Sequence, residues 1–316
     1  MAADLQNPIF QDDDKARAWL EARIWANGRN CPHCGAVEER TRKLEGKAHR
    51  PGVYQCNECR EQFTATVGTV MERSKLPLSK WLMAIYLLSA SKKGMSAHQL
   101  SRMLDISYKS TWFMMHRIRE AMREPSFLSG PLGGANKVVE VDETYVGGKE
   151  ANKHKAKRRA GMQGGKGKEA VVALVERDGY VRSFHVANVN ATNLRPILVS
   201  QIDRVTYLMT DDSSVYPKIG QEFSGHGTVN HSIEEYVRHG GFMHTNTVEA
   251  YFSILKRGIV GVYHHVSAAH LKRYVGEFDF RYNTRGISDM ERAELAAEGI
   301  KGKRLTYRRT GQAANA

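Results

Sequence analysis

The sequence predicts a multidomain protein of the α/β class, and three observations support this prediction. All four cysteines fall in one short segment, apolar residues recur at helical spacing between residues 76 and 122, and strand-like alternation begins after residue 137. With 316 residues, the chain is longer than one average domain. We expect a helical lead at 1–28, a cysteine module at 29–70, a helical module at 71–124, a linker at 125–136, a mixed-sheet domain at 137–285 and a basic tail at 286–316.

The composition favours a polyanionic partner. A formal net charge of +13 at pH 7 indicates nucleic acid as the simplest choice. No apolar run approaches the roughly 18 residues of a membrane span. The N-terminus carries the acidic run Asp12-Asp13-Asp14 and does not resemble a signal peptide. We therefore expect a cytoplasmic, nucleoid-associated protein with no membrane partner.

The cysteines form two pairs with the spacing of metal-binding knuckles. Cys31 and Cys34 make the first pair, and Cys56 and Cys59 make the second. Four thiolates satisfy the tetrahedral preference of Zn²⁺, and the flanking segments alternate like the strands of a zinc ribbon. The first pair also matches a redox dithiol, but a redox protein does not require a second pair. We expect a structural zinc ion that supplies folding energy to this small module.

Residues 76–122 are predicted to form three helices, at 78–91, from Ser96 onward, and from Tyr108 to about Met122. A helix, a tight turn and a second helix with basic residues are typical of a helix-turn-helix. In that arrangement, Tyr108 and Lys109 in the first turn of the last helix would face DNA base edges. The alternative is an ordinary three-helix packing module.

The segment 125–136 is rich in Gly, Pro and Ser, which is typical of a linker. A strand follows at 137–145, and it carries Glu140 and Asp142 on one face, where buried charge is costly without a cation or partner. A glycine-containing basic run comes next and is expected to be a flexible loop that contacts nucleic acid. Its candidate DNA-binding residues are Lys155, Lys157, Arg158 and Arg159.

Further strands are expected at 170–176, 180–186 and 205–210, with a helix near 192–202 before the last of them. This order describes a mixed sheet in which the first and fourth strands can lie side by side. Asp142 within the first strand and Asp211 at the end of the fourth would then come together. A closing helix is expected at 267–283.

A helix is also expected at 245–258, with Val248, Tyr251 and Leu255 in its apolar stripe. Glu249 and Lys256 lie on a neighbouring face, which by itself is most simply a solvated Glu–Lys face. Together with two aspartates on adjacent strands, however, a glutamate on a packed helix makes a site for two divalent ions. Carboxylate oxygens suit Mg²⁺ or Mn²⁺, and two such ions can hold the attacking and leaving oxygens of a phosphodiester.

The motifs around these residues resemble those of bacterial insertion-sequence transposases of the DDE type. The resemblance rests on segments 141–148, 210–211 and 244–249, on Lys256-Arg257-Gly258 and on segment 274–283. The chain is most similar to the group with an N-terminal zinc ribbon and a ribonuclease-H-like core. The resemblance covers about residues 25–285.

The resemblance implies that Asp142, Asp211 and Glu249 are the catalytic carboxylates and hold two Mg²⁺ or Mn²⁺ ions. Lys256 and Arg257 would bind DNA. Because some relatives use asparagine in the third place, Asn246 is an alternative to Glu249. The implied activity is binding of terminal inverted repeats, strand cleavage and strand transfer into target DNA, by a homodimer or larger oligomer. A non-catalytic DNA-binding regulator and a hydrolysis-only nuclease of the same core are the alternatives.

Overall fold

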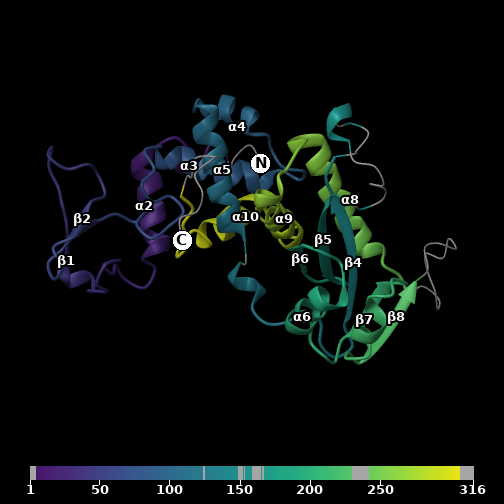
Figure 1. The fold of residues 1–316 in the computed structure, drawn as a ribbon. Helices are drawn as coiled ribbons and strands as arrows, with labels where there is room; N and C mark the ends of the chain where they lie inside the picture. Colours follow the sequence, from purple (N-terminus) through teal and green to yellow (C-terminus); the bar gives the residue numbers. More distant parts are fainter. Residues whose placement is uncertain are drawn as a thin grey trace. The chain divides into compact units, whose positions relative to one another are not determined.

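The computed structural model describes residues 5–123, 125–148, 152, 154–158, 165, 167–229 and 242–306. The chain divides into two units (Figure 1). One comprises residues 1–125 together with 287–316, and the other comprises residues 126–286. In the described part of the chain, no helix is long and apolar enough to cross a membrane.

The first unit begins with helix α2 and a small antiparallel sheet. Asp12 caps α2 (Asp13–Ile24) by accepting hydrogen bonds from the N–H groups of Asp14 and Lys15. The sheet consists of β1 (Thr41–Lys43), β2 (Tyr54–Cys56) and β3 (Gln62–Phe63), in that order. Short 3-10 helices lie at Pro8–Phe10 and Glu38–Arg40. The sheet carries the second cysteine pair at the end of β2, as the alternation in the sequence predicts.

Three helices follow the sheet: α3 (Leu78–Ala90), α4 (Ala97–Leu104) and α5 (Tyr108–Met122). Their ends match the sequence-based expectation because the capping residues are explicit. Ser96 accepts a hydrogen bond from the N–H of Gln99, and Ser107 accepts one from Ser110. Asp105 adopts a left-handed conformation (φ 49°) at the end of α4, which turns the chain sharply into α5.

The expected basic tail at 286–316 contains a helix, which corrects the sequence-based prediction. Helix α10 (Asp289–Glu298) begins with a capping box formed by Ser288 and Glu291. It packs against α3, and the N–H of Val70 then donates to the carbonyl of Ile300. The buried residues of α10 are Ala293, Ala296 and Ala297, whose small side chains give a weak apolar pattern in the sequence.

The second unit is built on a five-stranded mixed sheet. Its strands are β4 (Val138–Val146), β5 (Glu169–Glu176), β6 (Val181–Val186), β7 (Tyr207–Asp211) and β8 (Gly225–Val229), and their order is β6-β5-β4-β7-β8. The first three strands form an antiparallel meander, whereas β7 is parallel to β4 and β8 is parallel to β7. This is the ribonuclease-H-like arrangement that the resemblance implies.

Strand β8 is absent from the sequence-based prediction because its sequence, Gly-His-Gly-Thr-Val, has little apolar alternation. Its glycines are required by close packing. A Cβ on Gly225 would lie 2.3 Å from the ring of Tyr207, and one on Gly227 would lie 2.7 Å from the sulfur of Met209. The side chains of β7 therefore cover the positions that β8 leaves empty.

Helices cover both faces of the sheet. One face packs against α6 (Ala191–Gln201) and the short α7 (Tyr216–Gly220), and its core includes Val139, Val141 and Leu194. The other face packs against α8 (Asn246–Gly258) and α9 (Ala268–Asn283), and its core includes Ala173 and Leu255. A π-helical segment, Ile259–Tyr263, continues α8. Successive residues of β4 thus point alternately to the α6–α7 side and to the α8–α9 side.

The expected linker at 125–136 also differs from the prediction, since from Ser126 onward it belongs to the second unit. A 3-10 helix, Ser126–Leu128, opens the segment. Leu132 is 3% exposed and lies in the core beneath α6, and its backbone bonds to Gln201 and Asp203. One apolar side chain anchors this segment to the core, while Ser129, Gly130 and Pro131 before it are exposed. The basic run contributes one described turn, Lys155–Lys157.

Candidate active site and metal centre

Strand β4 presents its acidic residues to opposite faces of the sheet. Because Glu140 and Asp142 alternate with the buried Val139 and Val141, both lie on the side of α8. Glu143 points to the α7 side, as the alternation predicts, and its carboxylate accepts a 2.7 Å hydrogen bond from the hydroxyl of Tyr216. Asp142 accepts a 2.7 Å bond from the backbone N–H of Glu143. The α8 side of β4 is therefore the one that offers carboxylates to a shared site.

Asp211 ends the neighbouring strand on the same face. The parallel register places Met209 opposite Glu140. Two residues further along, Asp211 on β7 and Asp142 on β4 therefore point to the same face of the sheet. The sequence-based expectation that these two strands lie side by side is confirmed. Asp212, the adjacent carboxylate, is exposed and falls outside β7.

Glu249 comes to this site from the first turn of α8. The helix buries Val248, Tyr251, Phe252 and Leu255 against the sheet, which leaves Glu249 exposed beside the apolar stripe. Thr245, itself buried, donates a 3.3 Å hydrogen bond to the Glu249 carboxylate. Asn246 lies one turn earlier at i−3 and is also exposed, so both residues stand on neighbouring parts of one helix face.

The pKa of Asp142 depends on the negative charges around it. Burial, and after it the negative charges of Glu143, Asp211 and Glu249, raise the pKa of the Asp142 carboxyl to about 7, against the opposing hydrogen bond from the Glu143 N–H. Glu143 itself has a raised pKa, first because of burial and then because of Asp211. Crowded carboxylates of this kind are costly unless a proton or a cation neutralises them. The donor set therefore suits a divalent cation that prefers oxygen ligands.

The basic candidates are distributed over several elements. Lys256 and Arg257 are exposed near the end of α8, and Lys256 lies two helical turns, about 10 Å along the axis, from Glu249. Tyr108 and Lys109 are exposed in the first turn of α5, where the ring of Tyr108 stacks on His98. Lys155 and Arg158 are exposed as well. Arg159 and the side chain of Lys157 lie outside the described residues.

Two functional candidates escaped the sequence analysis: Arg177 and Tyr216. Arg177, just after β5, pairs with Glu140 through a 2.6 Å contact. Tyr216 is fully buried in α7 beneath Glu143. Neither residue stands in a motif, and the partners that make them informative come from distant parts of the chain.

The four cysteines of the first unit form a compact cluster. Their sulfur atoms all lie within 4.8 Å of one another, with 3.7 Å between Cys31 and Cys59 and 3.6 Å between Cys34 and Cys56. A tetrahedral zinc ion with Zn–S bonds of about 2.3 Å requires S–S edges of about 3.8 Å. The N–H groups of Cys59 and Glu58 lower the pKa of the Cys56 thiol to about 7, although burial opposes them. The cluster therefore fits a structural zinc ion.

A core of aromatic residues supports this cluster. Cys31 and Cys56 are buried with Tyr54 and Phe63, and Trp25 packs edge-on against both rings. Among the residues that the structure describes, no other group of three or more His, Cys, Asp or Glu side chains has donor atoms so close together. The donor atoms of Asp142, Asp211 and Glu249 therefore do not all lie within 4.8 Å of one another, unlike the four sulfur atoms.

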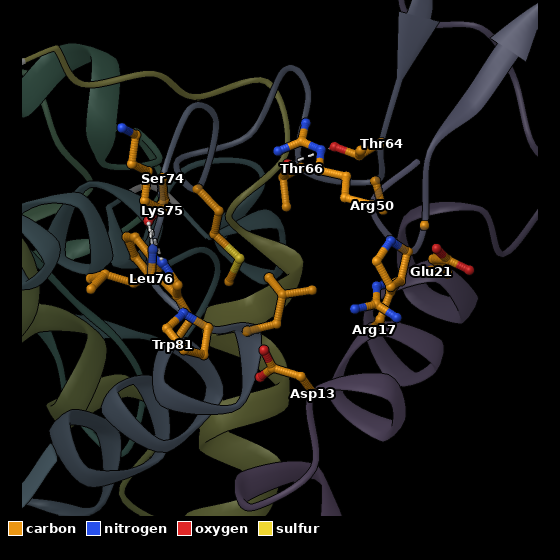
Figure 2. A pocket seen from close by; sticks show the side chains of 16 residues that line it. Asp13, Arg17, Glu21, Arg50, Thr64, Thr66, Ser74, Lys75, Leu76 and Trp81 are labelled. Carbon is orange, nitrogen blue, oxygen red and sulfur yellow. Dashed lines mark hydrogen bonds between the residues drawn. The ribbon is translucent and has the colours of Figure 1, made fainter. Parts of the chain in front are cut away.

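A cavity of about 270 Å³ lies in the first unit between α2, the loop after β3 and the start of α3. Figure 2 shows Asp13, Arg17 and Arg50 around it. Its carboxylates are engaged in structural bonds: Asp13 accepts from the N–H and the hydroxyl of Ser79, and Glu21 accepts from the Tyr54 hydroxyl. We assign this cavity to the packing of the small sheet against the helices.

A ribonuclease-H-like sheet with carboxylates on β4, β7 and the first turn of α8, in a chain that also carries a four-cysteine ribbon, is the arrangement expected of a transposase. Comparisons with known proteins agree. Residues 131–283 match the ISXO2-like transposase domain, and residues 11–62 match the transposase zinc-ribbon domain. The chain therefore belongs to the insertion-sequence transposases that combine an N-terminal zinc ribbon with an ISXO2-like domain.

Individual relatives are more distant. The chain is 27% identical over 288 residues to an uncharacterized protein in transposable element ISH50 of Halobacterium salinarum, which covers 86% of this chain and 91% of the relative. Among solved structures, the Mos1 strand transfer complex matches at 13% identity, with a TM-score of 0.28, over 69% of this chain and 73% of that one. The latter likeness is too slight to support an argument.

Proposed function

We propose that this transposase binds the terminal inverted repeats of its insertion sequence and catalyses divalent-metal-dependent strand cleavage and strand transfer into target DNA. The proposal rests on the placement of Asp142 and Asp211 on one face of neighbouring strands and of Glu249 in the first turn of the helix that covers this face, all within the segment that matches the transposase domain. The raised pKa of Asp142 supports it, because burial and then the neighbouring negative charges raise this pKa, and these charges are the groups that two Mg²⁺ or Mn²⁺ ions would neutralise.

Each residue has a distinct role in the proposal. Asp142, Asp211 and Glu249 would hold the metal ions through their carboxylate oxygens. When bound, these ions would supply charge neutralisation and activation of oxygen nucleophiles for phosphoryl transfer. Lys256 and Arg257, exposed on α8 after Glu249, would hold the DNA backbone beside the carboxylates. Catalysis would then rest on positioning and electrostatics, without a covalent bond between enzyme and DNA.

The first unit would supply recognition of the transposon ends. Helices α4 and α5 would act as a helix-turn-helix, in which the exposed Tyr108 and Lys109 at the start of α5 would contact bases and phosphates. Lys155 and Arg158, with Lys157 and Arg159, would add phosphate contacts from the second unit. Because two transposon ends must be joined in one event, we propose that the chain acts as a homodimer or larger oligomer on DNA.

The test is incubation of the full chain with labelled transposon-end DNA, a plasmid target and Mg²⁺. Covalent joining of the labelled 3′ end to the plasmid is expected. Cleavage of the end without joining would instead indicate a hydrolysis-only nuclease. Specific binding of the end with neither reaction, in both Mg²⁺ and Mn²⁺, would indicate a DNA-binding regulator.

A further inference from the structure

Glu140 is a carboxylate with no exposed surface in the middle of β4. It lies two residues before Asp142 on the same face of the strand, a separation of about 7 Å. An ionised carboxylate is very costly to bury without partners, and removal of one partner from such a pair leaves an uncompensated charge. The identity of its partners therefore indicates what Glu140 does.

The first partner is the N-terminus of α8. Glu140 accepts hydrogen bonds from the backbone N–H groups of Thr247 (2.8 Å) and Val248 (3.0 Å), and from the Thr247 hydroxyl (2.9 Å). The first N–H groups of a helix lack partners within the helix and are usually capped by the residue just before it. Thr245, at that position, makes no side-chain capping bond. A carboxylate from a strand more than a hundred residues earlier thus caps this helix.

The second partner is Arg177, whose guanidinium joins Glu140 to the segment entering α8. Its Nε lies 2.6 Å from the Glu140 carboxylate. Its two other nitrogens donate to the carbonyls of Phe242 (2.7 Å) and His244 (2.8 Å). The His244 ring also lies 3.1 Å from Glu140. The planar guanidinium holds three acceptors at once, which a lysine ammonium on its flexible stem does not reproduce.

We propose that Glu140 and Arg177 form a positioning pair that fixes the first turn of α8 against β4 and thereby sets Glu249 relative to Asp142. The inference rests on the proposed function of the three carboxylates. Glu249 directly follows Val248, whose N–H is bound to Glu140, and Asp142 lies two residues from Glu140 on a continuous strand. The connection from Asp142 through Glu140 and the Val248 N–H to Glu249 is therefore short. The same helix turn carries Asn246, so the pair would position either candidate for the third ligand.

The pair can be tested without any measurement of catalysis. In Glu140→Gln, an amide NH₂ replaces one of the oxygens that accept from N–H groups. We expect hydrogen exchange in the segment 243–250 to become at least tenfold faster. Glu277→Gln is the matched control, because Glu277 is equally buried, pairs with Arg281 and accepts from the Tyr263 hydroxyl, yet it does not cap α8. This control is expected to leave exchange in 243–250 unchanged.

The second readout is binding of Mn²⁺ to the full chain, followed by electron paramagnetic resonance. Groups that orient metal ligands typically contribute 10–100-fold to metal affinity. We expect the dissociation constant for Mn²⁺ to rise about tenfold or more in Glu140→Gln and to stay unchanged in Glu277→Gln. Arg177→Lys, which keeps the charge but loses the three-way bridge, provides an independent variant if Glu140→Gln does not fold, and it is expected to change exchange and Mn²⁺ affinity in the same direction.

The outcomes separate the two proposals. The proposed metal site is wrong if wild-type protein binds no Mn²⁺, or if Asp142→Asn does not abolish the binding. This holds whatever the exchange data show. If wild-type protein binds Mn²⁺ but both Glu140→Gln and Arg177→Lys bind it equally well, the positioning role is wrong. Faster exchange with unchanged Mn²⁺ affinity would also overturn the positioning role and leave only a structural one.

Discussion

Asp211 stands beside Asp142 because β7 pairs with β4 in the register that sets Met209 opposite Glu140. Two residues further along each strand, both side chains point to the face that α8 covers. A shift of one residue in this register would turn Asp211 toward the α6–α7 side and separate the two carboxylates. The negative charge of Asp211 contributes to the raised pKa of Asp142, as does that of Glu249. The site therefore depends on a backbone register as much as on its side chains.

The first prediction concerns the pH dependence of metal binding. The pKa of Asp142 is raised to about 7 in the metal-free protein, so the carboxyl is protonated below that pH and Mg²⁺ must displace the proton. Affinity for Mg²⁺ is expected to be constant above about pH 7 and to fall by up to about tenfold per pH unit below it. Calorimetric titrations between pH 6 and pH 8 measure this profile. Equal affinity across that range would show that Asp142 does not ligate the metal.

The second prediction distinguishes Glu249 from Asn246 as the third ligand. Since the charge of Glu249 raises the pKa of Asp142, its carboxylate lies within electrostatic reach of the site. We expect Glu249→Gln to lower strand joining at least a hundredfold, which is about 3 kcal/mol of transition-state stabilisation. Asn246→Ala is expected to retain most of the activity. The reverse pattern in the same joining assay would assign the third position to Asn246.

The third prediction concerns zinc. Four thiolates at tetrahedral spacing predict one zinc ion per chain, measurable by atomic absorption on undamaged protein. Removal of zinc by a chelator, or Cys56→Ser, is expected to unfold the small sheet because its core is little more than the cysteines and three aromatic rings. Near-ultraviolet circular dichroism of Trp25 and Tyr54 reports the loss. An unchanged spectrum after complete zinc removal would contradict the structural role.

The fourth prediction concerns Asp279, a buried carboxyl on α9. Burial raises its pKa to about 6, against opposing hydrogen bonds from the Tyr251 hydroxyl and from the hydroxyl and N–H of Ser183. The ordinary pKa is 3.8, so the unfolded chain releases this proton at lower pH than the folded one. The free energy of unfolding is therefore expected to fall as pH rises from about 4 to 6, by about 3 kcal/mol from this group.

Asp279→Asn provides the comparison, because its side chain does not ionise. Denaturant unfolding of both proteins at pH 4.5 and pH 7 isolates the contribution of Asp279, since the other carboxyls cancel in the difference. The destabilisation caused by the substitution is expected to be smaller at pH 7 than at pH 4.5. A destabilisation that is independent of pH would show that the pKa of Asp279 is not raised.

The sequence could predict much of the fold because several elements carry local signals. The helix at Ala268–Asn283 follows from a clear apolar stripe, and Ser96 and Ser107 mark helix starts by their capping chemistry. The pairing of β4 with β7 followed from the order of strands and the intervening helix. These signals lie within a few residues of the element that they define.

The remainder depends on tertiary contacts. Strand β8 contains two glycines that the side chains of Tyr207 and Met209 cover, and α10 buries only alanines, so neither has a strong apolar period. Glu140 could be identified from sequence as a second acidic residue on β4, but its role as a cap for α8 could not. Its partners, Arg177 and the N–H groups of Thr247 and Val248, come from distant segments.

Asp142, Asp211 and Glu249 are proposed to form the metal-dependent active site of this transposase. The most direct measurement compares strand joining in Asp142→Asn with joining in Asp212→Asn, an exposed carboxylate that neighbours Asp211 but lies outside β7. Joining of labelled transposon ends to a plasmid in Mg²⁺ is expected to fall at least a thousandfold in Asp142→Asn, about 4 kcal/mol, and to remain within about twofold of wild type in Asp212→Asn. Joining at the wild-type rate by folded Asp142→Asn protein would contradict the proposed role of Asp142 in the active site.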